Sequence, residues 1–194
     1  MTNHLDEPED AIPLTADERQ GLIPSHVTLR SELNELEQQN ILEADAWAFS
    51  RKHDPIKESF LRSLHKRMFG DVWRWAGSYR TSDKNLGTDH WQIQTKLREA
   101  MDNAQYWIDH KTYAPDEIAV RFHRALVFIH PFPNGNGRWS RLMADILAVR
   151  LGQKRFTWGR STLRASDVMR RTYINALKAA DGHDFAPLIA FARS

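Results

Sequence analysis

The sequence of 194 residues contains no cysteine, which excludes disulfide bonds, thiolate metal sites and a cysteine nucleophile. It also lacks any run of about 18 apolar residues, so we expect no helix that crosses a membrane. The first ten residues are acidic, whereas a signal peptide begins with a basic region and then an apolar one. We therefore expect a cytoplasmic protein whose chemistry does not depend on thiols.

Basic side chains are missing from the first 18 positions, which carry six acidic residues. The rest of the chain carries all 27 basic residues against 19 acidic ones, a net charge of +8. Such a body is typical of proteins with anionic partners, either nucleic acids or phosphorylated small molecules, although a solvated basic surface has the same composition. No recognisable nucleic-acid-binding motif is present, so nucleic acid is the partner that we expect least.

The chain divides into an acidic arm and one larger domain. Residues 1–24 contain three prolines and no hydrophobic periodicity, and we predict an arm that is partly disordered or folded back on the body. In residues 25–194, apolar side chains recur mostly at steps of three and four, which is typical of amphipathic helices. We predict a single, mainly α-helical domain over these residues.

Hydrophobic spacing and helix-end signals predict helices at about 31–50, 55–70, 97–108, 115–130, 135–151, 165–180 and 185–193. Asp54 and Pro55 are the cap and first residue expected for the second of these. The end of the fourth, ALVFIHPF, is apolar on nearly every face, so this helix is predicted to run through the centre of the fold.

One segment, between Gly77 and Gln94, breaks the helical pattern. Its last residues, HWQIQ, alternate between polar and apolar, and the NLG before them suits a turn. We predict a small β-hairpin at about 81–93, with an irregular loop as the alternative.

The segment HPFPNGNGRWSR, residues 130–141, is the strongest candidate for a functional site. Prolines end one helix at His130, and glycines precede the next helix, whose first backbone N–H groups are unpaired and can bind an anion. Arg138 and Arg141 are three residues apart and share a face of that helix, and arginine matches phosphate oxygens well. These features predict a polyphosphate site with a histidine at its edge.

Other phosphate and metal motifs fit this segment less well. The glycine spacing lacks the third glycine of a dinucleotide-binding fingerprint and follows a helix instead of a strand, and no G-x-x-x-x-G-K-[ST] motif is present. His123 and His130 are seven residues apart on a helix, about 10.5 Å by helical rise, which is too far to share one metal ion.

The segment resembles the motif of Fic-domain (Fido) proteins, H-x-F-x-[DE]-G-N-G-R-x-x-R, at every fixed position except one. The resemblance extends from about residue 31 to the C-terminal helix, and the stretches LIPSHVTLRSELNELEQQN and WRWAGSYRT are similar to a bacterial subgroup called mobile mystery protein B. It implies a helical bundle with a β-hairpin flap over the active site. It also implies transfer of AMP from ATP to a hydroxyl side chain of a target protein, which would pair with the flap.

The resemblance also implies a role for each matching residue. His130 would be the general base, which suits an imidazole near neutral pH, and Phe132 would anchor the loop in the core. The phosphates would be held by the loop and helix residues Asn134, Gly135, Asn136, Gly137, Arg138 and Arg141, with Asn136 on the α-phosphate and the two arginines on the β- and γ-phosphates. Tyr173 would lie on the helix at the adenine side.

Asn134 is the departure from the motif, since the family usually has an acidic ligand to Mg²⁺ there. An amide offers Mg²⁺ an oxygen but no charge, so we expect Mg²⁺ with only a weak protein ligand. Three outcomes remain open: a slow AMP transferase, transfer of another phosphate-containing group, or a nucleotide- or partner-binding protein without turnover.

Two family variants bear on this chain. Doc-type toxins, which transfer a phosphate, have a lysine where this sequence has Gly137, and this favours AMP transfer. Many family members carry an inhibitory helix, [ST]-x-x-x-E-[GN], whose glutamate pairs with the second motif arginine. Ser31 and Glu35 match its first part, but Leu36 follows where glycine or asparagine should.

Trp139 is expected to pack in the core, with lining of the pocket as the alternative.

Overall fold

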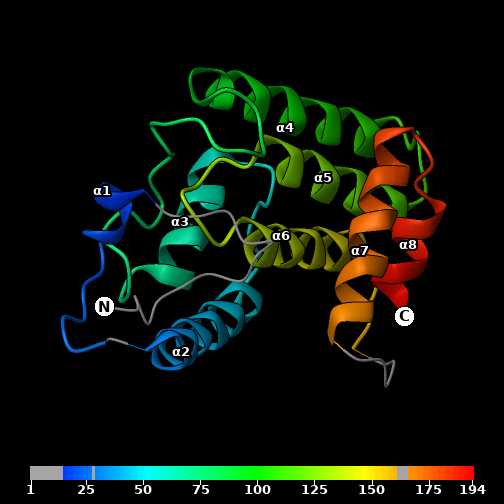
Figure 1. Ribbon diagram of the computed structural model, residues 1–194. Helices are drawn as coiled ribbons and strands as arrows, with labels where there is room; N and C mark the ends of the chain where they lie inside the picture. Colours follow the sequence, from blue (N-terminus) through cyan, green and yellow to red (C-terminus); the bar gives the residue numbers. More distant parts are fainter. Residues whose placement is uncertain (1–14, 28, 161–165) are drawn as a thin grey trace.

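The computed structural model describes residues 15–27, 29–160 and 166–194, and the described part is mainly helical, as predicted (Figure 1). Its α-helices are α1 (Ala16–Arg19), α2 (Arg30–Ser50), α3 (Glu58–Phe69), α4 (Ile93–Asp109), α5 (Pro115–Ile129), α6 (Asn136–Arg150), α7 (Ser166–Asp181) and α8 (Ala186–Arg193). A 3-10 turn, His90–Gln92, leads into α4.

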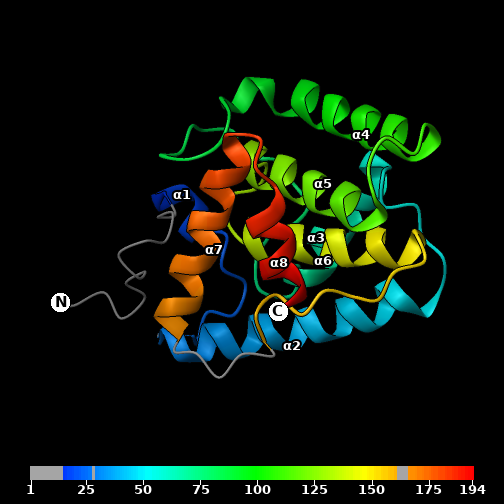
Figure 2. The same ribbon diagram turned by 90° about the vertical axis from the view of Figure 1, so that its right-hand side faces the viewer.

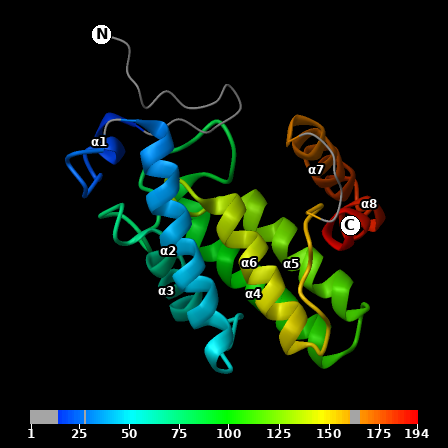
Figure 3. The ribbon, with the colours of Figure 1, turned by 90° about the horizontal axis from the view of Figure 1, so that it is seen from below.

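Helices α5 and α6 form the centre of the molecule and pack against each other. Helix α4 covers α5, and the pair α2 and α3 lies against α6 (Figures 2 and 3). The last two helices of the chain, α7 and α8, pack against each other. The prediction that residues 115–130 run through the centre is correct, because most of their apolar side chains are buried. Phe128 is the exception, with 52% of its surface exposed.

The start of α3 differs from the prediction. Asp54 and Pro55 do not open the helix, which begins at Glu58. The Asp54 carboxylate accepts a hydrogen bond from the Ile56 N–H at 3.2 Å and pairs with Arg150 at the end of α6. Asp54 therefore stabilises a turn before the helix and ties that turn to α6.

The predicted β-hairpin at 81–93 is wrong, because the described residues of this segment form no strand pair. One buried guanidinium organises the segment instead. Arg80 donates to the carbonyl oxygen of Ser82 at 2.8 Å, to that of Thr88, and to that of His130 at 2.8 Å. Since the side chain satisfies carbonyls on both arms, the arms need not pair with each other. We call residues 81–89 the flap loop.

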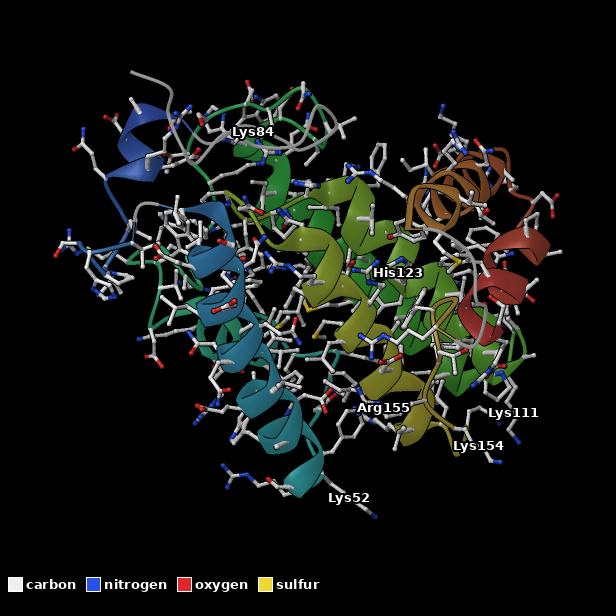
Figure 4. All side chains as sticks on the ribbon, turned by 60° about the horizontal axis from the view of Figure 1, so that its bottom comes forward. Lys52, Lys84, Lys111, His123, Lys154 and Arg155 are labelled. Atoms are coloured by element: carbon white, nitrogen blue, oxygen red, sulfur yellow. The ribbon has the colours of Figure 1, made fainter. Side chains whose placement is uncertain are left out.

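The end of the acidic arm folds back on the body, while residues 1–14 lie outside the described part. The Ile23 N–H donates to the Val72 carbonyl at 2.8 Å, and Leu22 forms an isolated β-bridge with Trp73. Glu18 pairs at 2.5 Å with Lys84 of the flap loop, which is labelled in Figure 4. Both charged side chains are largely buried, so the arm and the flap loop hold each other in place.

Candidate active site

A cavity of about 370 Å³ lies where α5 ends and α6 begins. It gathers almost every residue that the sequence singled out. Its lining consists of Leu86, Val127, His130, Asn134, Gly135, Asn136, Gly137, Arg138, Arg141, Arg170, Tyr173 and Ile174. Of the predicted site residues, only Phe132 lies elsewhere, because its side chain is fully buried in the core. We call this space the first cavity.

His130 ends α5 in a left-handed backbone conformation, with a φ of 52°. Arg80 holds this turn by donating from Nε to the His130 carbonyl at 2.8 Å. Burial lowers the pKa of His130 to about 4, and the charges of Arg80 and Lys84 act in the same direction, whereas the Val127 carbonyl favours the protonated form. The ring is therefore neutral at physiological pH and able to accept a proton.

The flap loop packs directly on this histidine. Gly87 has a φ of +101°, and a Cβ added there would lie 2.7 Å from the Cβ of His130. Only glycine allows the backbone to come so close. Leu86, the residue before it, lines the first cavity and is itself 59% exposed. The flap loop thus forms one wall of the site.

Close contacts shape the loop after His130 and leave no space for a side chain at Gly135. Gly135 has a φ of +78°, and a Cβ there would lie 2.5 Å from the ring of Phe69. The Asn136 side chain accepts from the Phe132 N–H at 3.0 Å and donates to the Phe132 carbonyl at 2.8 Å. Asn136 therefore clamps the loop with its amide, and it offers an anion its backbone N–H at the start of α6.

The approach to the start of α6 is open at Gly137, where an added Cβ would meet nothing within 4 Å. This is where the first N–H groups of the helix have no partner within the helix. An anion can therefore reach the backbone here without displacing a side chain. The helix dipole favours negative charge at the same place.

The two motif arginines differ in their partners. Arg138 pairs with Glu37 of α2 at 2.7 Å, and Glu37 is almost completely buried. The other oxygen of Glu37 accepts from the indole N–H of Trp73 at 2.7 Å. Arg141 has no carboxylate partner among the described residues and lies over the ring of Tyr173 at 5.6 Å. A carboxylate thus competes with any ligand for Arg138 but not for Arg141.

The glutamate of the partial match to an inhibitory helix forms no ion pair with the motif arginines in the described part, but a neighbouring glutamate does. Glu35 is exposed on α2 and makes no contact with either motif arginine, whereas Glu37, two residues later, contacts Arg138. The spacing of α2 contained a usable signal, because Glu37 is four residues from the buried Leu33 and three from the buried Asn40. It therefore lies on the inward face of the helix.

His65 supports the site and was missed by the sequence analysis. Its Nδ1 accepts from the Gly77 N–H at 3.0 Å, so the proton sits on Nε2, which donates to the Asn134 carbonyl at 3.0 Å. The ring stacks on Phe132 with 3.6 Å between centroids. Burial lowers the pKa of His65 to about 3. A neutral histidine of α3 thus fixes the loop that carries Asn134.

A second buried histidine fixes the far wall of the first cavity. His123 of α5 lies between α5 and α7 (Figure 4), with its Nε2 3.0 Å from the hydroxyl of Tyr173. Burial lowers the pKa of His123 to about 3 and raises that of Tyr173 to about 12. A neutral imidazole can accept a hydrogen bond from the Tyr173 hydroxyl at Nε2, and this contact holds the Tyr173 ring against the cavity.

The residues at the first cavity do not fit a protein-anchored Mg²⁺ ion. The side-chain oxygen of Asn134 accepts from the Gly135 N–H at 2.5 Å, so one of its two lone pairs is used by the loop. No carboxylate lines the first cavity in the described part, which also contains no cluster of three or more metal-ligating side chains. Positive charge for an anion therefore comes from arginines and from the start of α6.

Comparison with known proteins agrees with this arrangement. Residues 55–148 match the model of the Fic/DOC family. "Protein adenylyltransferase Fic" of Nematostella vectensis is 28% identical over 145 residues, 73% of this chain and 32% of that protein. "Protein adenylyltransferase fic-1" of Caenorhabditis elegans is 30% identical over 107 residues, 53% of this chain and 21% of that protein. The chain thus spans about a third or less of the length of these relatives.

Solved structures share the fold. BepC of Bartonella tribocorum, determined with bound AMPPNP, has a TM-score of 0.70 at 17% identity, with 92% of this chain and 97% of that chain covered. The N-terminal Fic domain of a putative cell filamentation protein of Bartonella quintana, determined with bound ADP, has a TM-score of 0.69 at 17% identity and covers 91% of this chain and 94% of that chain. At these identities the likeness establishes the fold alone. The described part of the chain contains no helix that is both long and apolar enough to span a membrane.

Proposed function

We propose that this chain, whose residues 55–148 match the Fic/DOC family model, is a protein adenylyltransferase that moves AMP from ATP to a hydroxyl side chain of a target protein. One observation carries this proposal. A neutral histidine, an open helix start and a half-buried arginine, Arg141, which has no carboxylate partner among the described residues, line one cavity. Relatives named as adenylyltransferases, and similar folds determined with AMPPNP and ADP, support it.

The proposed reaction is a substitution at the α-phosphorus of ATP. His130 accepts the proton of the target hydroxyl as its oxygen attacks, the bond to the β-phosphate breaks, and pyrophosphate leaves. The backbone at Asn136 and Gly137 holds the α-phosphate, and Arg138 and Arg141 stabilise the negative charge that develops on the leaving group. Tyr173 borders the space for the adenine.

The proposal is tested with ATP labelled on the α-phosphate, incubated with the protein and a cell lysate. We expect label on at least one protein, and none when His130→Asn replaces the natural protein. If neither the natural protein nor Asn134→Asp labels any protein, the transferase proposal is wrong. Nucleotide binding without label in either form would support the second candidate, a binding protein without turnover, which the uncharged Asn134 favours.

Asn134→Asp is expected to raise the activity in the presence of Mg²⁺. The substitution places a carboxylate, which Mg²⁺ prefers, where the first cavity has only an amide. Labelling rates should rise by roughly tenfold with Mg²⁺, about the effect of one charged ligand, and change little without it. The measurement is a Mg²⁺ titration of both forms. Equal rates at all Mg²⁺ concentrations would contradict the prediction.

Glu37→Gln is expected to tighten binding of ATP. Glutamine keeps an oxygen for the indole of Trp73 but removes the charge that competes for Arg138. Because a charged hydrogen bond is worth about 1.5–3 kcal/mol, we expect about tenfold or tighter ATP binding and little change for AMP. The matched control is Glu35→Gln, an exposed position on the same helix, which should leave both affinities unchanged. Equal ATP affinity of the two variants would contradict the prediction.

Several finer features also remain proposals. The stretches similar to mobile mystery protein B motivate membership of that bacterial subgroup, and a cytoplasmic location is likewise a proposal. We further propose that the target protein docks at the flap loop. The support is that Leu86, which lines the first cavity with His130, and Trp91, in the 3-10 turn after the loop, are both strongly exposed.

A further inference from the structure

A second cavity lies beside the first, and the present account of the reaction does not use it. It has a volume of about 550 Å³ and is lined by residues of α2, α3 and α6 and of the segment 155–160 that follows α6. Arg138 and Arg141 line both cavities, so the two spaces meet at the motif arginines. The second cavity therefore borders the end of the site where the outer phosphates of ATP would lie.

The second cavity is lined by more positive than negative charge. Its charged residues are Asp45, Arg138, Arg141, Asp145, Arg155 and Arg160. Both aspartates are occupied by Arg155, which lies 2.5 Å from Asp45 and 3.4 Å from Asp145, and which is labelled in Figure 4. Asp145 also accepts from the indole N–H of Trp158 at 2.9 Å. Asp145 also acts on Arg141 through its charge, but the two carboxylates face four arginines, so the lining keeps an excess of positive charge.

Arg141 and Arg160 are left without a carboxylate partner among the described residues. Burial lowers the pKa of Arg141, and the positive charges of Arg138 and Arg160 act in the same direction, whereas Tyr173 and Asp145 act in the opposite one. Neighbouring cations of this kind repel each other in a partly enclosed space, where charges are weakly screened. An anion between them would relieve this repulsion.

The proposed reaction produces an anion of the right kind. Transfer of AMP breaks the bond between the α- and β-phosphates and releases pyrophosphate beside Arg138 and Arg141. Since the first cavity offers no carboxylate for Mg²⁺, the charge of pyrophosphate has to be met mainly by arginines. The second cavity contributes two arginines that do not line the first: Arg155, which pairs with the aspartates, and Arg160.

We propose that the second cavity binds inorganic pyrophosphate, the leaving group of the proposed transfer, between Arg141 and Arg160. This inference rests on the proposed function for its ligand. Pyrophosphate and AMP then occupy different cavities that share the motif arginines. Arg160 acts on the release of product, and it does not touch the bond between AMP and the target hydroxyl.

The test is calorimetric titration of the full chain with inorganic pyrophosphate and, separately, with AMP. The variant is Arg160→Met, which removes a charge whose side chain has no ion-pair partner in the described part and so should not disturb folding. We expect pyrophosphate binding to weaken by about tenfold or more, the worth of one charged hydrogen bond, and AMP binding to stay unchanged. The control is Arg51→Met, an exposed arginine at the C-terminal end of α2, which should change neither affinity.

Each outcome separates this inference from the proposed function. Equal pyrophosphate affinity of Arg160→Met and the natural protein overturns the inference, and so does an equal loss of AMP and pyrophosphate binding. A natural protein that binds AMP but not pyrophosphate overturns the inference and leaves the proposed function intact. A natural protein that binds neither also overturns the inference, while the labelling experiment with ATP decides the proposed function separately.

Discussion

His130→Asn is expected to lower the rate of AMP transfer by about 10²–10⁴-fold, the usual contribution of a general base. The substitution removes the only imidazole that lines the first cavity in the described part. Asparagine is the preferred replacement because position 130 has a φ of 52°, which asparagine tolerates better than most residues. The loss should therefore come from the missing base and not from a strained backbone.

The measurement separates chemistry from binding. We expect the loss in kcat, from rates of labelling at saturating ATP, while the ATP affinity from calorimetry stays close to that of the natural protein. A matched control is His110→Asn, an exposed histidine after α4, which should leave both quantities unchanged. If His130→Asn keeps the kcat of the natural protein, His130 is not the general base of the reaction.

The pH dependence of the natural protein should carry the same signature. Burial and two nearby cations hold the pKa of His130 at about 4. The value of kcat/KM reports on the free protein, so titration of His130 should not lower it between pH 8 and about pH 5. The phosphates of bound ATP favour the protonated ring, so the acid limb of kcat should lie at higher pH than that of kcat/KM. Coincident limbs would contradict the placement of His130 beside the phosphates.

The sequence contained enough information to predict the local features of the site. The glycines, the prolines and the arginines of residues 130–141 act through backbone conformation and helix ends, which depend on near neighbours in the chain. The structure accordingly brings these residues to one cavity. The helices were predictable for the same reason, because the spacing of apolar residues reports directly on a buried face.

The features that were missed depend on residues far apart in the chain. Arg80 holds the carbonyl of a residue 50 positions away, and His65 holds one 69 positions away. The hairpin prediction failed because alternation over five residues also fits a turn that leads into a helix. There, Trp91 is exposed in the 3-10 turn while Ile93 is buried at the start of α4. One signal for His65 was available, since it shares a helix face with Leu61 and Met68.

The protein is expected to lose much of its stability between pH 6.5 and pH 5. Burial holds the pKa values of three histidines far below 6.5, at about 3 for His65 and His123 and about 4 for His130. In this range the unfolded chain binds protons on these rings and the folded protein does not, so stability falls as the pH falls. Each ring contributes a slope of about 1.4 kcal/mol per pH unit once the unfolded chain is protonated.

One buried carboxyl acts in the opposite direction. Burial raises the pKa of Asp145 to about 6, so the folded protein binds its proton more readily than the unfolded chain between pH 6 and pH 4. This offsets about one of the three histidine contributions. The net loss between pH 6.5 and pH 5 is then roughly 4 kcal/mol, a large part of the stability of a typical domain.

Urea unfolding at a series of pH values measures this loss, and one variant assigns it. His123→Gln cannot gain a charge, keeps a polar partner for Tyr173, and should reduce the pH slope by about 1.4 kcal/mol per pH unit, whereas His110→Gln, at an exposed position, should leave it unchanged. A natural protein of equal stability at pH 6.5 and pH 5 would contradict the burial of neutral histidines around the site. The same burial keeps His130 unprotonated at physiological pH, so that it can accept a proton in the reaction. The burial of neutral histidines that prepares the site in this way also makes the protein less stable in acid.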